Sequence, residues 1–153
     1  MTDGLVQLSF LVQSVLSRAA ADNELTVPQV RLLGILRDRE PGMMQLAKYL
    51  GLDKSSVTGL IDRAERRGLV RRASSSEDGR AVHVCATALG SQLTEQVSAD
   101  IEHQMQDLVD ELDESDRQIL TKLLRRIVFS NGTLAAGGRG HGPADQRSTP
   151  ADV

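Results

Sequence analysis

The sequence contains very few aromatic residues and almost no cysteine. Phe, Tyr and Trp together make up 2% of the 153 residues, and Cys85 is the single cysteine. One cysteine excludes an intramolecular disulfide framework and a cysteine-based zinc cluster. The scarcity of rings argues against binding of single-stranded nucleic acid, which relies on aromatic side chains that stack on bases. The core must instead be built from Leu, Val, Ile and Ala.

Long apolar runs and enzyme motifs are also missing. No run approaches the ~18 apolar residues of a membrane span, and no N-terminal signal pattern is present, so a cytoplasmic protein without membrane contact is expected. No nucleophile–base pair, phosphate-binding loop or metal cluster appears, so we expect no enzyme, no cofactor and no metal. His103 lies near Glu102 and Asp107, but no second His stands at ligand spacing.

Charge is unevenly distributed along the chain. The net charge is −3, which alone argues against a nucleic-acid partner. The stretch from Met43 to Gly90, however, holds eight Lys or Arg and five Asp or Glu. Its net charge is therefore +3, and the net charge of the rest of the chain is −6. A basic segment in an acidic chain indicates a surface that meets an anion. A solvated charged face would have the same composition.

Helical periodicity dominates both ends of the chain. Apolar spacing predicts a helix from Leu5 to Ala21, and a second begins at the capping box Thr26–Gln29. A long helix capped by Thr87 carries an apolar stripe as far as Leu112. At ~1.5 Å per residue it would span roughly 39 Å, more than one small domain can cover.

The C-terminal end is expected to hold one more helix and a tail. Ser115–Gln118 has the pattern of a capping box, and apolar residues follow at helical spacing. Residues 131–153 are rich in Gly, Ala, Ser and Pro without apolar periodicity, which predicts disorder.

The centre combines two short helices with a hairpin. The helices are expected over residues 43–50 and 54–67, with Asp53 as the cap of the second and Gly68 as its stop. Strands at 69–72 and 81–86 follow, joined by a polar loop too long for a two-residue turn. A loose hairpin directly after a helix-turn-helix is a wing. We therefore expect a mostly α protein with a small β-hairpin, a winged helix-turn-helix.

The second short helix has an outward face suited to DNA. Its apolar residues share one side, and the opposite side carries short hydroxyls early and arginines late. Small residues permit close approach to a major groove, and hydroxyls can contact phosphates or base edges. Arg63 is the candidate for base contact, whereas Arg66 and Arg67 are expected to meet phosphates or solvent. The DNA-binding residues predicted on this helix are Ser55, Ser56, Thr58, Gly59, Arg63 and Arg66.

The wing supplies three further candidates. Gly79 allows a sharp turn, from which Arg80 could enter a narrow minor groove. Asp78 could hold that guanidinium through a charge-assisted bond. Arg72 adds a positive charge at the base of the wing. A solvated turn with an incidental ion pair is the simpler alternative for the tip.

Several motifs in order resemble the MarR (multiple antibiotic resistance regulator) family of bacterial transcription factors. They are Leu46–Thr58, Ile61–Arg63, Arg67–Arg72, Asp78–Val82 and Thr87–Gly90, at the spacing of that family. The resemblance runs from about Leu5 to Phe129. It implies a homodimer that reads a palindromic operator in double-stranded DNA, with 54–67 as the recognition helix and Arg80 in the minor groove. It also implies that a small-molecule effector releases the DNA in some members.

The same resemblance suggests how the chain is divided. We expect an N-terminal dimerisation helix (1–24), a winged helix-turn-helix domain (25–88), C-terminal dimerisation helices (89–130) and the tail. The apolar stripes at both ends exceed what one small lobe covers, which also favours a dimer, with Phe10 and Phe129 in its core. A repressor is expected, but no residue identifies an effector.

Three positions depart from the family pattern. Gly59 stands where many relatives have a long side chain, so an expected DNA contact is missing; Ala64 replaces a commoner Leu; and Met43-Met44 replace a helix-capping Ser or Thr. Cys85 lies on a wing strand, where a packing residue is more plausible than a redox sensor. The alternative function is a winged-helix protein-interaction module without DNA binding, which would not need exposed arginines on the recognition face or wing.

Overall fold

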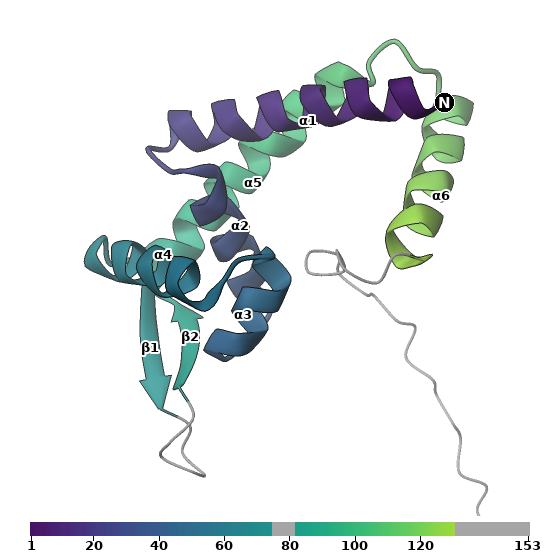
Figure 1. Ribbon diagram of the computed structural model, residues 1–153. Coiled ribbons are helices and arrows are strands. Elements are labelled where there is room, and N and C mark those ends of the chain that lie inside the picture. Colours follow the sequence, from purple (N-terminus) through teal and green to yellow (C-terminus); the bar gives the residue numbers. More distant parts are fainter. Residues whose placement is uncertain (75–81, 131–153) are drawn as a thin grey trace, which may run out of the picture.

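The computed structural model describes residues 1–74 and 82–130 of the chain (Figure 1). The elements in chain order are α1 (Thr2–Asp22), α2 (Val27–Leu36), α3 (Met43–Leu50), α4 (Lys54–Arg66), β1 (Val70–Ser74), β2 (Val82–Ala86), α5 (Ala88–Leu108) and α6 (Glu114–Ser130). The protein is thus mostly helical with one antiparallel two-stranded hairpin, as the sequence predicted. A lobe formed by α2–α4 and the hairpin lies at one end of α5, and α1 packs along α5.

Local side-chain caps set the helix starts within the lobe. The Thr26 hydroxyl accepts from the backbone N–H of Gln29, whose side chain accepts from the N–H of Thr26, so the expected capping box is present. Asp53 caps α4 as predicted. Gly42 begins α3 without a side-chain cap, but its N–H donates to Gln45 at 3.1 Å. Gly51 and Gly68 end α3 and α4 with φ of 65° and 70°, a region that favours glycine.

The hairpin is joined to the linker between α2 and α3. Strands β1 and β2 pair from Val70 opposite Ala86 to Ser74 opposite Val82. On the other edge of β2, Gly42 forms an isolated bridge with His83, and the N–H of Val84 donates to the Pro41 carbonyl at 3.0 Å. One bridge and one further hydrogen bond thus connect the linker, and with it the start of α3, to the root of the wing.

A single aliphatic core fills the lobe and reaches onto α1 and α5. Leu32, Leu46, Val57, Ile61 and Val84 are among its least exposed side chains, with 0% exposure each. None is aromatic, in agreement with the composition. Ala64 on α4 is also buried, so the small side chain at this position packs within the core.

The junction between the hairpin and α5 is unusually close. Thr87 caps α5 by accepting from the Gly90 N–H at 3.0 Å, and its hydroxyl donates to the Gly68 carbonyl at 2.6 Å. Gly90 lies so near β1 that a Cβ on it would stand 1.9 Å from the Leu69 carbonyl oxygen. This approach fixes the start of α5 against the base of the wing.

Two boundaries at the C-terminal end differ from the sequence prediction. Helix α5 ends at Leu108 rather than near Leu112, because the chain turns through Val109–Leu112. The cap of α6 is Asp113, whose carboxylate accepts from the Asp116 N–H at 2.9 Å, so the predicted capping box at Ser115 is wrong. The Arg117 side chain donates to the Leu112 carbonyl and stabilises this turn, an interaction that local sequence patterns do not reveal.

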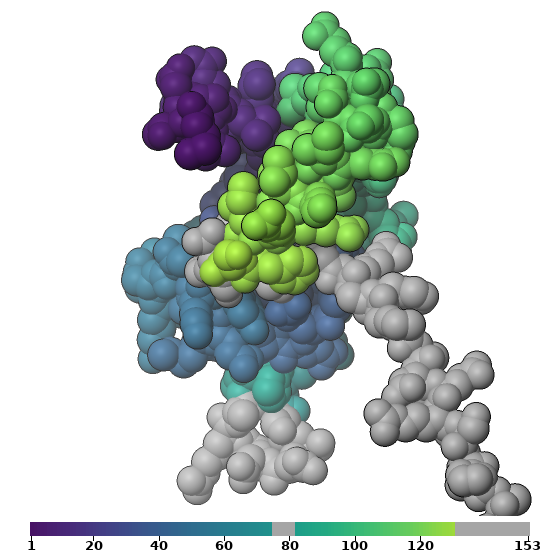
Figure 2. All heavy atoms as spheres, turned by 90° about the vertical axis from the view of Figure 1, so that its right-hand side faces the viewer, coloured from purple at the N-terminus to yellow at the C-terminus, as the bar shows by residue number. Residues whose placement is uncertain are grey.

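Helices α1 and α6 leave apolar side chains uncovered. None of the residues of α6 is buried, and Phe129 and Phe10 are 72% and 64% exposed. Figure 2 shows α6 on the surface of the molecule. Helix α1 has 21 residues and contains an 18-residue window with a mean hydropathy of 1.2, so by length and composition alone it could cross a membrane. That property was not expected from the sequence, in which polar residues interrupt every apolar run.

Candidate nucleic-acid interface

The amino end of α4 carries a hydrogen-bonded cluster around Asp53. Its carboxylate accepts from the Ser56 N–H at 2.9 Å and from the hydroxyls of Ser55 and Ser56 at 2.5 and 2.6 Å. These bonds hold the pKa of Asp53 well below its ordinary value, and the two bonds from the serine hydroxyls contribute most. Asp53 is therefore ionised, and both serine protons point to it rather than outward.

The predicted Thr58 contact shows the same local use of a hydroxyl. Its Oγ1 donates to the Lys54 carbonyl one turn earlier, at 2.8 Å. All three hydroxyls that the sequence proposed as DNA contacts are thus engaged within α4 or with its cap. Each must redirect its proton before it can donate to a phosphate.

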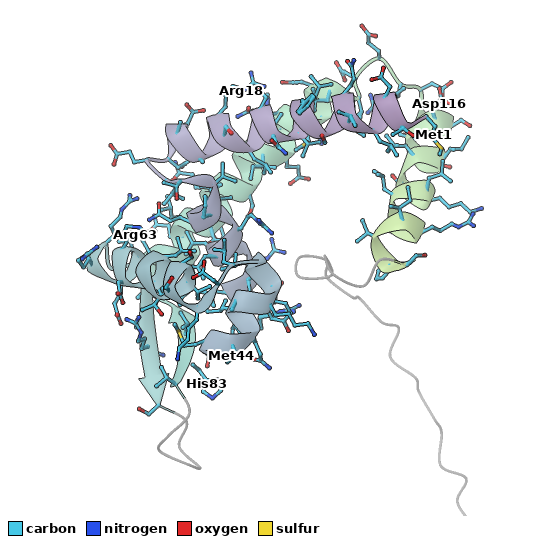
Figure 3. All side chains as sticks on the ribbon, in the orientation of Figure 1. Met1, Arg18, Met44, Arg63, His83 and Asp116 are labelled. Atoms are coloured by element: carbon cyan, nitrogen blue, oxygen red, sulfur yellow. The ribbon has the colours of Figure 1, made fainter. Side chains whose placement is uncertain are left out.

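Gly59 and Arg63 form a pair on the outward face of α4. A Cβ at Gly59 would stand 3.3 Å from Arg63 Nη1, so the guanidinium lies directly over the glycine. Figure 3 shows Arg63 on the outer part of the lobe. The absent side chain at Gly59, which looked like a missing contact in the sequence, therefore makes room for Arg63.

A shallow groove connects this arginine with the serines. Its lining consists of Pro28, Leu52, Ser55, Ser56, Gly59, Leu60 and Arg63. Pro28 and Leu52 were not among the predicted site residues, because their proximity to α4 depends on how α2 and the α3–α4 turn pack. The groove offers hydroxyl oxygens at one end and a guanidinium at the other.

Arg72 lies between the wing and α4 instead of extending freely. Its Nη2 binds Asp62 Oδ1 at 2.6 Å, its Nη1 binds Glu65, and its backbone N–H donates to Glu65 Oε1 at 3.1 Å. The hydrogen bond that Arg72 donates to Asp62 is the main reason that the pKa of Arg72 is raised. Two carboxylates offset its charge, so Arg72 ties the base of β1 to α4.

The remaining charged residues considered in the sequence analysis have three different outcomes. Arg66 is exposed at the end of α4, and its side chain forms no hydrogen bond or ion pair with any residue that the structure describes. Arg67, for which phosphate or solvent was expected, instead donates from Nη1 to the Glu24 carbonyl at 2.6 Å. Asp78 and Arg80 lie outside the described residues.

Cys85 and His83 belong to the packing of the wing root. Cys85 is 2% exposed, as expected of a packing residue, and burial is the main cause that raises the pKa of its thiol. The His83 Nδ1 lies 3.1 Å from the Glu40 carbonyl. Within residues 1–74 and 82–130, no three His, Cys, Asp or Glu side chains are grouped so that they could hold a metal ion.

Comparison with known proteins gives this surface a context. Residues 23–81 match a model of the MarR family. IacR, an HTH-type transcriptional repressor of Pseudomonas putida, is 31% identical over 109 residues, which cover 71% of this chain and 65% of IacR. This chain spans 41 to 65% of the length of three curated relatives that it matches.

Solved structures agree over a larger part of the chain. The transcriptional regulator PA4135 is 31% identical with a TM-score of 0.70, over 83% of this chain and 94% of that protein. NadR, solved in complex with 4-hydroxyphenylacetate, is 25% identical with a TM-score of 0.67, over 81% of this chain and 89% of NadR. The matched family model and these relatives together show that the chain belongs to the MarR family of transcriptional regulators.

Proposed function

We propose that this protein is a sequence-specific DNA-binding regulator, a repressor, that binds a palindromic operator as a homodimer. Helix α4 enters the major groove, with Arg63 at base edges and Arg66 at a phosphate, and the wing with Asp78 and Arg80 meets the adjacent minor groove. The observation that carries the proposal is the outward face of α4, where the exposed Arg63 guanidinium lies over Gly59. Arg72 supports this surface by joining α4 to the wing.

The homodimer accounts for the uncovered apolar helices. Leu123, Leu124 and Phe129 on α6 are 47%, 42% and 72% exposed, and no helix within residues 1–74 and 82–130 covers them. Burial of such side chains against a second copy is favourable by about 25 cal/mol per Å² of apolar surface. Helices α1, α5 and α6 thus form the dimer interface and residues 25–88 the DNA-binding domain. The apolar surface of α1 is used in this interface rather than in a membrane, which agrees with a cytoplasmic location.

A small cavity between α2 and α5 is the proposed effector site. It has a volume of about 120 Å³ and is lined by Leu25, Val30, Leu33, Gly34, Thr94, Val97, Ser98 and Ile101. Its wall is apolar apart from the hydroxyls of Thr94 and Ser98, so it suits a small phenolic ring, and 4-hydroxyphenylacetate, the ligand in the NadR complex, carries such a ring. A rise in melting temperature with 4-hydroxyphenylacetate, together with DNA release, would support this site.

Arg63→Ala is the direct test of base recognition. The protein is first used to select duplexes from a random library, and the best-bound duplex becomes the probe. Loss of one bidentate contact, about 1–3 kcal/mol, should weaken binding by about fivefold to 150-fold and relax the preference at one base pair. Arg18→Ala on α1, far from α4 in Figure 3, removes the same charge and should leave affinity unchanged.

Two results would contradict the proposed function. If wild-type protein enriches no duplex, the chain is not a DNA reader, and the protein-interaction module becomes the better explanation. If Arg63→Ala lowers the affinity for all duplexes by the same factor, Arg63 contacts a phosphate rather than a base. The affinity of the wild-type complex should also fall steeply as salt rises, because phosphate contacts release counterions.

Asp53→Asn should raise DNA affinity. Asparagine keeps the helix cap but removes a negative charge beside Ser55 and Ser56. Repulsion between this carboxylate and a nearby phosphate would be relieved, which should lower Kd by about fivefold at low salt. Binding is measured by fluorescence anisotropy, with Asp53→Ala as the control that loses both charge and cap. Weaker binding by Asp53→Asn would mean that the carboxylate itself orients the serines for contact.

A further inference from the structure

The turn between α1 and α2, residues 23–25, is attached to α5. Asn23 is 7% exposed, and its Nδ2 donates to the Ala19 carbonyl and to Asp100 Oδ2, both at 2.8 Å. Asp100 lies on α5, so a buried amide joins the end of α1 to the middle of the long helix. The Leu25 N–H closes the turn by donating to the Ala20 carbonyl at 2.8 Å.

The next residue in the turn is attached to the recognition helix. Glu24 has a φ of 54°, and it is the one non-glycine residue with positive φ among those the structure describes. Such a backbone is unfavourable for glutamate and persists only where its surroundings hold it. The contact that engages it is the bond from Arg67 Nη1 to the Glu24 carbonyl, 2.6 Å long. Arg67 is the C-cap of α4.

These bonds form a continuous connection from α5 through the turn to α4. We propose that Arg67 is a positioning residue for DNA binding, which fixes the orientation of the recognition helix relative to the dimerisation helices. The inference rests on the proposed function. Two recognition helices that enter successive major grooves must stand about 34 Å apart, and a lobe that pivots on α5 would change this separation. By holding the end of α4, Arg67 restricts that pivot.

Two simpler roles for Arg67 make different predictions. A cation at the C-terminus of a helix stabilises its dipole, and an exposed arginine can bind phosphate. If Arg67 had either role, its loss would lower stability or affinity by the same amount whatever the distance between half-sites. A positioning role instead changes which spacing of half-sites the dimer prefers.

The experiment compares one selected duplex with two altered versions. The best-bound duplex from the random library is prepared with its original centre, with one central base pair inserted and with one removed. Arg67→Ala should reduce the preference for the original spacing by about tenfold, the effect of one charge-assisted hydrogen bond. Arg67→Lys should largely retain the preference for the original spacing, because the lysine ammonium can also donate to the Glu24 carbonyl. Arg66→Ala should weaken binding to all three duplexes alike.

A second measurement does not depend on DNA. One nitroxide label is placed on each protomer through Lys54→Cys in a Cys85→Ala background, and the distance between the two labels is measured. The distribution should broaden in Arg67→Ala and in Asp100→Ala, which breaks the other end of the connection, but not in Arg66→Ala. Unchanged spacing preference in Arg67→Ala, or unchanged distance distributions, would overturn the inference. A wild-type protein that selects no duplex would overturn the proposed function and the role in DNA binding, while the distances still report whether Arg67 holds α4.

Discussion

Replacing Leu123 by Asp is expected to convert the protein from a dimer to a monomer and to weaken binding to a palindromic duplex by about 100-fold or more. Leu123 is 47% exposed within one chain, on a helix with no buried residue. In the dimer it would be covered, and a charge placed there would be buried without a partner. Loss of the dimer removes the gain from binding two half-sites together.

Light scattering coupled to gel filtration gives the mass, and anisotropy gives the affinity. Gln118→Asp serves as the matched control, because Gln118 lies on the polar side of α6, where it donates to Glu114. The control should remain a dimer and bind DNA as the wild type does. A Leu123→Asp protein that is still dimeric would contradict the assignment of α6 to the interface.

Gly90→Ala should destabilise the protein by about 3 kcal/mol or more. The added Cβ would stand 1.9 Å from the Leu69 carbonyl oxygen and 2.9 Å from its carbon. Both atoms are backbone and belong to the start of the hairpin, so neither can turn aside as a flexible side chain would. Either α5 or the base of β1 must shift, which also disturbs the Thr87 bonds to Gly68 and Gly90.

Urea denaturation at a fixed protein concentration measures this loss. Gly34→Ala is the control: Gly34 is also in a helix, but a Cβ there meets nothing within 4 Å. Alanine is favoured over glycine inside a helix by about 0.5–1 kcal/mol, so the control should be slightly stabilised. Equal stability of Gly90→Ala and the wild type would show that the close approach at Leu69 relaxes without cost.

The sequence identified features that depend on neighbours along the chain. The caps at Thr26, Asp53 and Thr87 were predicted correctly, because each acceptor and its N–H lie within one helical turn. Ser115 was predicted as the cap of α6, whereas Asp113 caps it. Both residues can cap a helix, and the turn closed by Arg117 decides where α6 begins.

Sequence patterns did not predict the contacts between residues that lie far apart in the chain. Arg72 and Arg67 were assigned to DNA or solvent from their charge alone, yet Arg72 binds Asp62 and Glu65, and Arg67 binds the Glu24 carbonyl 43 positions away. Gly59 likewise appeared to be a loss until the structure placed the Arg63 guanidinium above it. In each case the outcome depends on how α4 packs, which periodicity does not specify.

The pairing of residues 41–42 with β2 also bears on how the protein can diverge. Most connections on a protein surface tolerate insertions and deletions during evolution. The connection between α2 and α3 tolerates few changes of length, since Pro41 and Gly42 bond to Val84 and His83, and Gly42 is also the N-cap of α3. An extra residue there would displace the wing and the first helix of the helix-turn-helix at once. Changes of chain length between relatives should therefore accumulate elsewhere, for instance in the turn between α5 and α6.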